Sequence, residues 1–135
     1  MTRIVITGAS GRMGANLLRA VSEGEGTELA GAVDRPGAET VGRDAGELAG
    51  TGPLGVAVSD DLADVLGGAD AVIDFTLPEA TTRYAQQCAE AGVALVVGTT
   101  GFDADQKAIL DDAAGHIPMV VAPNMSIGVN LTFKV

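Results

Sequence analysis

Near its N-terminus the chain reads Ile4-Val5-Ile6-Thr7-Gly8-Ala9-Ser10-Gly11-Arg12-Met13-Gly14, an apolar run followed by glycines spaced GxxGxxG. Dinucleotide-binding turns more often read GxGxxG, and here Ser10 stands at the middle glycine while Gly11 follows it. The glycines still serve the same ends: Gly8 allows a sharp turn, Gly11 allows a diphosphate to approach the backbone, and Gly14 allows close helix packing. The alternative is a purely structural turn. The position between a first strand and an amphipathic helix favours a helix N-terminus that binds phosphate.

The rest of the chain alternates short apolar runs with helical patterns. We expect strands at residues 3–7, 28–33, 56–58, 71–75, 93–97 and 117–122. Helices are expected at 11–22, at 78–91 between Pro78 and Gly92, and from Asp103, with Gln106 completing a capping box. A short helix is expected after a cap at Ser59 or Asp60, and 37–55 reads as a loop with one helical turn. The pattern predicts an α/β, Rossmann-type doubly wound parallel sheet of about six strands with helices on both faces, forming one domain over residues 1–125.

An acid follows the second expected strand, about 20 residues beyond Gly14. Asp34 stands where a carboxylate accepts hydrogen bonds from the adenosine ribose of a bound dinucleotide. Arg35 follows it and can pair with a 2′-phosphate, so the two residues together suggest that both NADH and NADPH are accepted. The alternative is an ordinary solvated turn, because Pro36 and Gly37 come next. The order of strand, helix and acid favours the binding role.

Three further segments follow expected strands, where open α/β sheets bind ligands. Gly98-Thr99-Thr100-Gly101 combines exposed backbone with short hydroxyl donors, and the alternative is a plain loop. Asp74-Phe75-Thr76 and the segment from Ala122 to Ser126 occupy matching positions. For Asp74 we favour a carboxylate that accepts hydrogen bonds from loop N–H groups over a catalytic one.

Composition narrows the function classes. Eighteen acidic against eight basic residues give a net charge of −10, which argues against a nucleic-acid partner. The acidic surface fits either a high-salt cytoplasm or a lysine-poor, GC-rich genome. Cys88, the single cysteine, is expected to be buried in a helix, which suits a reducing compartment. No apolar run is long enough for a membrane span and no signal peptide is visible, so we expect a cytoplasmic protein.

Candidate catalytic groups are scarce. His116, the single histidine, falls between a helix and a strand, where a helix C-terminal cap is favoured over a catalytic acid. We find no metal-binding cluster, no Ser/His/Asp set and no pair of carboxylates spaced for acid–base work, so no catalytic residue is assigned.

Four ordered segments resemble the dihydrodipicolinate reductases, also called 4-hydroxy-tetrahydrodipicolinate reductases. They are Gly8 to Gly14, Asp74-Phe75-Thr76, Gly98-Thr99-Thr100-Gly101-Phe102 and Asn124-Met125-Ser126-Ile127-Gly128-Val129-Asn130. The resemblance implies an enzyme of the diaminopimelate route to lysine that reduces a cyclic dicarboxylate imine with NADH or NADPH. Alternatives are the nucleotide domain of another dehydrogenase, such as a homoserine or aspartate dehydrogenase relative, and a redox-sensing NAD-binding module.

The resemblance also implies roles for particular residues. The pyrophosphate would be held by Gly8, Ala9, Ser10, Gly11, Arg12 and Met13, the ribose by Asp34, and the 2′-phosphate by Arg35. The residues near the nicotinamide would be Gly98, Thr99, Thr100, Ala122, Pro123, Asn124 and Met125. Thr100 would also touch a substrate carboxylate. The segment after Ser126 would be helical, although the alternation over 127–135 favours a strand.

Family members continue into a second domain with a His-His motif, a lysine and a Gly-Thr pair, which bind the dicarboxylate, supply the proton and form a homotetramer. This sequence has one histidine and hence no His-His motif, and it does not include the stretch in which family members carry that lysine and Gly-Thr pair. We interpret residues 126–135 as the start of the connection to that domain. By itself the chain is expected to bind dinucleotide and hardly to catalyse.

Overall fold

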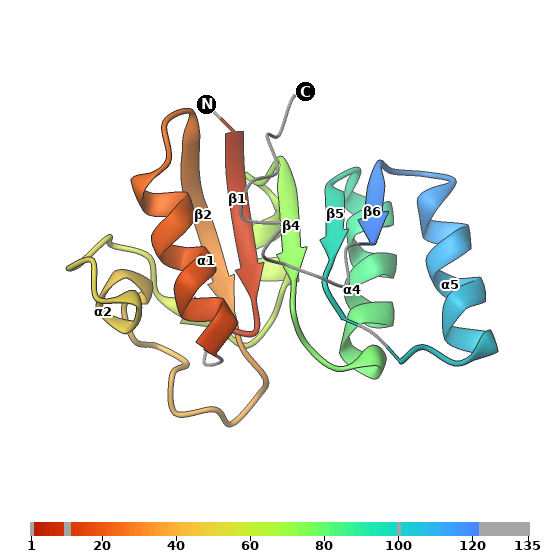
Figure 1. Ribbon diagram of the computed structural model, residues 1–135, viewed down its shortest axis with the longest axis horizontal. Helices are drawn as coiled ribbons and strands as arrows, with labels where there is room; N and C mark the ends of the chain where they lie inside the picture. The colour runs from red at the N-terminus through yellow and green to blue at the C-terminus, as the bar shows by residue number, and fades with distance from the viewer. Residues whose placement is uncertain (1, 10–11, 100, 122–135) are drawn as a thin grey trace.

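The strands of this chain form one six-stranded sheet. A computed structural model describes residues 2–9, 12–99 and 101–121. The strands are β1 (Thr2–Thr7), β2 (Thr27–Val33), β3 (Val58–Ser59), β4 (Ala71–Asp74), β5 (Ala94–Val97) and β6 (Met119–Val121). They lie in the order β3-β2-β1-β4-β5-β6, and every neighbouring pair is parallel. The order reverses between β1 and β4, so the predicted doubly wound Rossmann-type sheet is confirmed (Figure 1).

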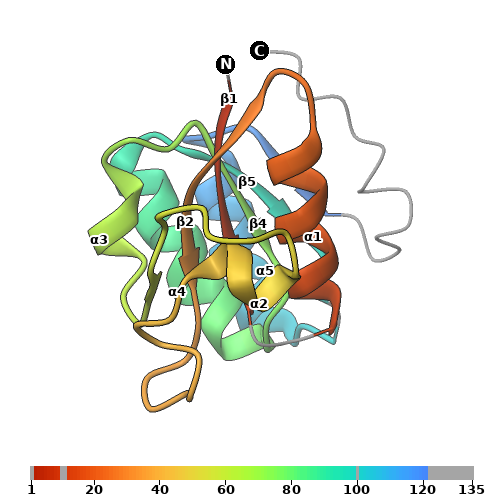
Figure 2. The ribbon, with the colours of Figure 1, turned by 90° about the vertical axis from the view of Figure 1, so that its left-hand side faces the viewer.

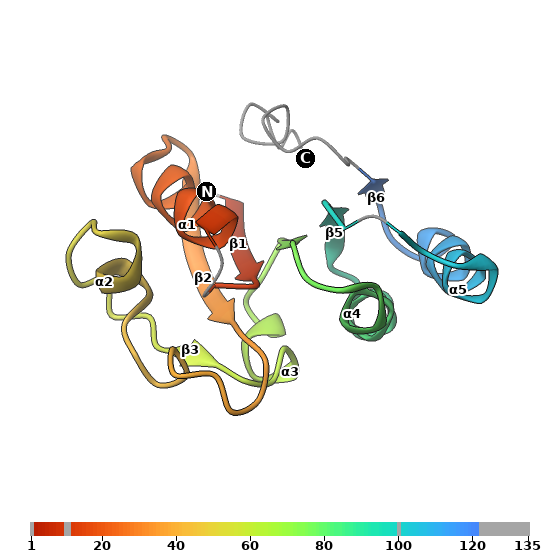
Figure 3. The same ribbon diagram turned by 60° about the horizontal axis from the view of Figure 1, so that its bottom comes forward.

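Helices cover both faces of this sheet (Figure 2). They are α1 (Arg12–Glu23), α2 (Ala45–Ala49), α3 (Ala63–Leu66), α4 (Pro78–Ala91) and α5 (Ala104–Ala114). Helices α1 and α2 lie on one face, and α3, α4 and α5 lie on the other (Figure 3). Alternate strand residues feed the two cores: Ile4 and Ile6 pack on the α1 side, and Val5 packs on the α4 side.

Three predictions about helix termini and burial are confirmed. Helix α4 begins at Pro78 and ends at Ala91, with Gly92 in the left-handed conformation at φ 71°. Helix α5 opens with the reciprocal Asp103–Gln106 capping box. Cys88 is fully buried in α4.

The third strand lies further along the chain than predicted. Strand β3 spans Val58–Ser59, not 56–58, because the backbone at Val56 and Ala57 is bound to another segment. Ala45 donates its N–H to the Val56 carbonyl at 2.7 Å, and Asp44 and Ala57 form an antiparallel bridge. The preceding loop therefore takes backbone groups that a longer strand would need.

The starts of α3 and β6 also differ from the prediction, by two residues or more. Helix α3 begins at Ala63 without a cap from Ser59 or Asp60, because Asp61 binds the first-turn N–H of Ala63 at 3.0 Å. Strand β6 begins at Met119, after Pro118, which has no N–H for the ladder. The prediction for 127–135 lies outside the described residues.

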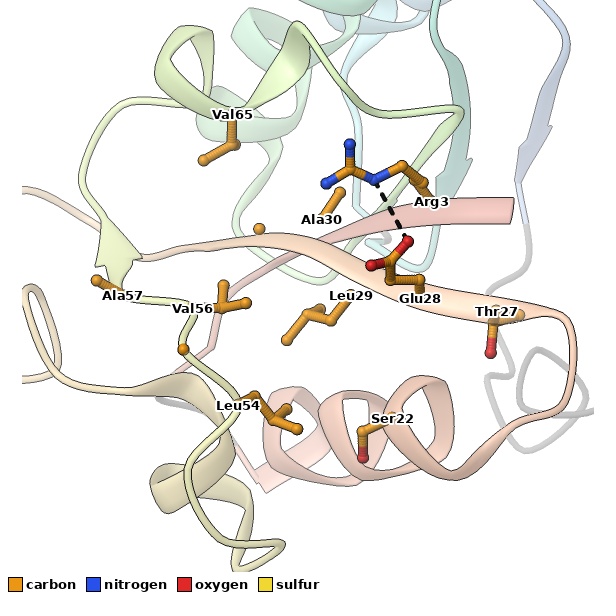
Figure 4. A pocket seen from close by; sticks show the side chains of 12 residues that line it. Arg3, Ser22, Thr27, Glu28, Leu29, Ala30, Leu54, Val56, Ala57 and Val65 are labelled. Carbon is orange, nitrogen blue, oxygen red and sulfur yellow. Dashed lines mark ion pairs between the residues drawn. The ribbon is translucent and has the colours of Figure 1, made fainter. Parts of the chain in front are cut away.

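The outer edge of β2 borders a groove of about 620 Å³ (Figure 4). Strand β3 pairs only with Ala32 and Val33, so the first part of β2 has the groove as its neighbour. Leu54 and Val65 lie on opposite sides of the strand, and Arg3 pairs with Glu28 at 3.7 Å. Within the described ranges no helix combines the length and apolarity of a membrane span, and no three potential metal-ligating side chains gather.

Candidate functional site

The turn after β1 is shaped by two glycines. Gly8 has φ +74°, and a Cβ at this position would collide with the carbonyl oxygen of Phe75 after β4. A Cβ on Gly14 would collide with the carbonyl oxygen of Gly8. Helix α1 therefore starts close to the carboxyl end of β1, where its first N–H groups have no partner within the helix. Gly8 and Gly14 thus allow the close approach of strand and helix that a phosphate-binding turn requires.

Asp34 lies at the end of β2, next to this turn. The two segments are linked, because Ala9 donates its N–H to the Val33 carbonyl at 3.2 Å. The Asp34 carboxylate is only 4% exposed and accepts hydrogen bonds from Thr40 Oγ1 at 2.6 Å and from the Arg35 N–H at 2.8 Å. These two bonds help to fix its orientation.

A cleft of about 520 Å³ opens between the ends of β1, β2 and β4. It brings together three of the predicted residues, Gly8, Asp34 and Arg35, and adds residues that follow β4 or belong to α4. The lining residues are Gly8, Asp34, Arg35, Phe75, Thr76, Leu77, Glu79, Ala80, Arg83 and Tyr84. Leu77 is 70% exposed and gives the cleft an apolar rim. The groove at β2 is somewhat larger but shares none of these residues.

Sequence reasoning missed the contributions of Leu77, Arg83 and Tyr84 to this cleft. They lie near the start of α4, the helix that follows β4, so their sequence spacing gives no hint of Asp34. Burial raises the pKa of Tyr84, and the nearby carboxylate of Asp74 raises it further. The phenol therefore stays neutral around neutral pH.

Gly98 and Thr99 directly follow the carboxyl end of β5. Gly98 donates its N–H to the main-chain carbonyl of Asp74 at 2.8 Å, which extends the β4–β5 pairing past the strands. Thr99 is 6% exposed and accepts the Thr76 N–H at 3.2 Å. Its side chain therefore faces the neighbouring strand end and not solvent.

The structure corrects the role expected for Asp74. Within the described part of the chain its carboxylate accepts hydrogen bonds from the hydroxyls of Thr7, Thr76 and Thr81, not from loop N–H groups. The neighbouring hydroxyls supply enough donors, and the loop N–H of Thr76 goes to Thr99.

Other predicted residues are placed less directly. Met13, in the first turn of α1, is half-buried and packs against the core on the α1 face of the sheet. His116 is exposed one residue beyond Gly115, the last-turn cap of α5, and its N–H donates to the Ala113 carbonyl at 2.9 Å. The predictions for Ser10, Gly11, the Arg12 side chain, Thr100, Ala122, Pro123, Asn124 and Met125 lie outside the described residues.

The sheet order, the turn after β1 and the acid after β2 define a Rossmann-type nucleotide domain. A family profile described as the N-terminus of dihydrodipicolinate reductase matches residues 2–125. The chain therefore belongs to the dihydrodipicolinate reductase family and corresponds to its N-terminal part. This membership decides against the nucleotide domain of a homoserine or aspartate dehydrogenase.

Individual relatives agree with this assignment. The chain is 62% identical over 133 residues to a 4-hydroxy-tetrahydrodipicolinate reductase of Alkalilimnicola ehrlichii, matching 98% of this chain and 50% of that protein. It is 57% identical over 134 residues to a reductase of the same name from Anaeromyxobacter dehalogenans, matching 99% of this chain and 50% of that protein. The chain thus spans about half the length of these curated relatives.

A solved structure shares the fold. The dipicolinate-bound dihydrodipicolinate reductase from Paenisporosarcina sp. superposes with a TM-score of 0.74 at 26% identity. The match covers 95% of this chain and 49% of that one. The likeness therefore extends over nearly the whole of this chain.

Proposed function

We propose that this chain binds NADH or NADPH and forms the cofactor-binding half of a 4-hydroxy-tetrahydrodipicolinate reductase in lysine biosynthesis. One observation carries the proposal: the glycine turn after β1 and the buried Asp34 after β2 border the same cleft. The names of the relatives support the reaction.

The cleft fits the adenosine half of a dinucleotide. A Cβ on Gly8 would collide with the Phe75 carbonyl oxygen, and a Cβ on Gly14 would collide with the Gly8 carbonyl oxygen. The close approach of β1 and α1 therefore exists only because these two residues lack side chains. Asp34 would accept the ribose hydroxyls, and Leu77 would cover the base. Arg35 and Arg83 both line the cleft, and no ion pair holds either of them within residues 2–9, 12–99 and 101–121. They would favour the 2′-phosphate of NADPH.

The residues of this chain would bind the dinucleotide and orient its nicotinamide. The first N–H groups of α1 and the partial positive charge of the helix N-terminus would hold the pyrophosphate. Gly98 and Thr99 would lie beside the nicotinamide, together with the predicted Thr100 and Ala122 to Met125. A bound nicotinamide supplies the hydride. Binding and delivering a proton to the cyclic dicarboxylate would fall to the second half of such a reductase, which this sequence does not include.

The division of labour leads to a domain proposal. Residues 1–125 would form the cofactor domain, and 126–135 would begin the connection to a substrate-binding and tetramerisation domain. Thr100 would reach a substrate carboxylate across the interface between the two halves.

A chimera tests the function directly. This chain would replace the first half of the Alkalilimnicola ehrlichii reductase, and oxidation of NADH would be followed with 4-hydroxy-tetrahydrodipicolinate as substrate. We expect turnover by the chimera and NADH binding without turnover by the separate chain. A chimera that folds and binds NADH but leaves the substrate unreduced would contradict the reductase assignment and favour a redox-sensing module.

A further inference from the structure

Asp74 is a buried carboxylate for which the proposed function has no ligand contact. It ends β4 at the point where the strand order reverses, and it is 0% exposed. Its Oδ1 accepts the hydroxyls of Thr7 and, at 2.8 Å, Thr76. Its Oδ2 accepts the hydroxyl of Thr81. A carboxylate out of contact with water needs such donors, because burial of an unsatisfied charge is costly.

The four threonines around it leave no hydroxyl unused. Thr99 Oγ1 lies 2.9 Å from Thr81 Oγ1 and 3.4 Å from Asp74 Oδ2, and it donates to the Thr76 carbonyl at 3.1 Å. Thr76 returns its own N–H to Thr99 Oγ1. Each hydroxyl therefore has a partner, and turning one would leave another buried polar atom unsatisfied. We call Asp74 with Thr7, Thr76, Thr81 and Thr99 the Asp74 cluster.

Three members of the Asp74 cluster belong to or adjoin segments of the proposed cofactor site. Thr7 directly precedes the phosphate turn, and Thr76 lines the adenosine cleft. Thr99 directly follows Gly98 at the strand end assigned to the nicotinamide. Thr81, in the first turn of α4, lines no part of that cleft and serves only the cluster.

We propose that Asp74 is a positioning residue, which sets the distance between the adenosine cleft and the nicotinamide end of the sheet without touching the cofactor. This inference rests on the proposed NAD(P)H site. A dinucleotide binds tightly when both halves are engaged at once, so the spacing between their sites governs the affinity of the whole molecule more than that of either half.

Two probes separate positioning from general loosening: NADH, which needs both ends of the site, and ADP, which lacks the nicotinamide riboside. We expect Thr81→Val to raise the Kd of NADH at least about tenfold, as misplaced binding segments do, and the Kd of ADP less than about twofold. Thr81→Ser restores the hydroxyl and should bind NADH within about twofold of the original chain. Calorimetry on the full 135-residue chain gives each Kd.

Thr82→Val is the matched control, since Thr82 is the adjacent buried threonine of α4 and donates to the Glu79 carbonyl at 2.9 Å. It should leave the ratio of the two Kd values unchanged. The proposal would be overturned if Thr81→Val weakened NADH and ADP binding equally or did not weaken NADH binding. It would also be overturned if Thr82→Val changed the ratio of the two Kd values as much as Thr81→Val does. If Thr81→Val does not fold, Asp74→Asn carries the same expectation. Failure of the unaltered chain to bind either probe would instead remove the cofactor site itself.

Discussion

At the scale of single residues, the most specific prediction concerns the role of Asp34 in NADH binding. Replacement by alanine would remove the proposed acceptor for the ribose hydroxyls, and loss of such a buried partner costs about 1–3 kcal/mol. We expect Asp34→Ala to weaken NADH binding by roughly 5- to 150-fold, measured by calorimetry. Glu39→Ala is the control, because Glu39 is an exposed acid outside the cleft. Equal NADH affinities for the Asp34 variant and the unaltered chain would exclude Asp34 from the site.

Arg35 is the residue that we expect to discriminate between NADPH and NADH. Arg35→Gln removes a charged donor for the 2′-phosphate, so we expect NADPH affinity to fall more than NADH affinity. The measurement is the pair of dissociation constants at low and high salt, and the selective loss should shrink as salt screens the charge. Arg43→Gln, an exposed arginine away from the cleft, controls for net charge. A uniform loss for both cofactors would show that Arg35 does not read the phosphate.

Single residues were predictable where a local pattern fixes them. The roles of Gly8 and Gly14 follow from a turn between strand and helix, and Asp34 follows from the length of one helix and one strand. The partners of Asp74 were not predictable in this way, because Thr7 lies 67 residues from it in the chain. Only the pairing of β1 with β4 brings the two together.

At the scale of elements, the packing of α1 against the turn depends on Gly14. A methyl group there would collide with the Gly8 carbonyl oxygen and would lie 3.0 Å from the Ala9 Cα. Both contacts are with backbone atoms, which cannot move aside without shifting the chain. We expect Gly14→Ala to lower the free energy of unfolding by about 1–3 kcal/mol, as overpacking does. Gly67→Ala is the matched control, since Gly67 has φ −60° and open space around it. Equal urea midpoints for the two variants would contradict this packing.

The stability of helix α2 and of the loop before β3 should depend on pH through Asp44, the N-cap of α2. Asp44 caps it, and its carboxylate also accepts N–H groups of Leu54 at 3.0 Å and Gly55 at 2.8 Å. The Leu54 hydrogen bond is the main reason that the pKa of Asp44 lies below its ordinary value of 3.8, and desolvation opposes it. A lowered pKa means that the contribution of Asp44 to stability is present above about pH 4 and is lost as the pH falls through the lower folded-state value.

The destabilisation caused by Asp44→Ala should therefore be larger at pH 7 than at pH 3. Urea unfolding at the two pH values measures it, with Glu25→Ala, an exposed acid in a turn, as the control. A difference between variant and original chain that stays constant with pH would rule out the carboxylate as its source.

Elements with strong local signals were predicted well, and those whose bounds depend on distant backbone were not. Helix α4 has Pro78 and Gly92 at its ends, and both act within a few residues. Strand β3 is shorter and later than its apolar run, because the segment around Asp44 binds the backbone at Val56 and Ala57. The sequence of residues 56–58 alone does not show that another segment binds their backbone.

At the scale of the whole molecule, the six parallel strands follow from the alternation of apolar runs and helices, since each crossover must return across one face of the sheet. The two faces then bury separate cores, and the α4 side encloses Cys88. Burial raises the pKa of the Cys88 thiol to about 12, and the charge of Asp74 adds to the shift. The folded chain therefore presents neither an accessible nor an ionised thiol at pH 8.

Cys88 thus reports on opening of the whole domain. We expect the disulfide reagent DTNB to react with the native chain far more slowly than with the chain in urea. NADH binds the folded state, so 100 Kd of NADH should stabilise it by about 2.7 kcal/mol and slow the labelling about 100-fold when opening is in rapid equilibrium. Inorganic phosphate at the same concentration is the control and should slow labelling much less. Labelling that ignores NADH would mean that Cys88 is reached by a local opening of α4, while the cofactor-binding edge of the sheet stays folded.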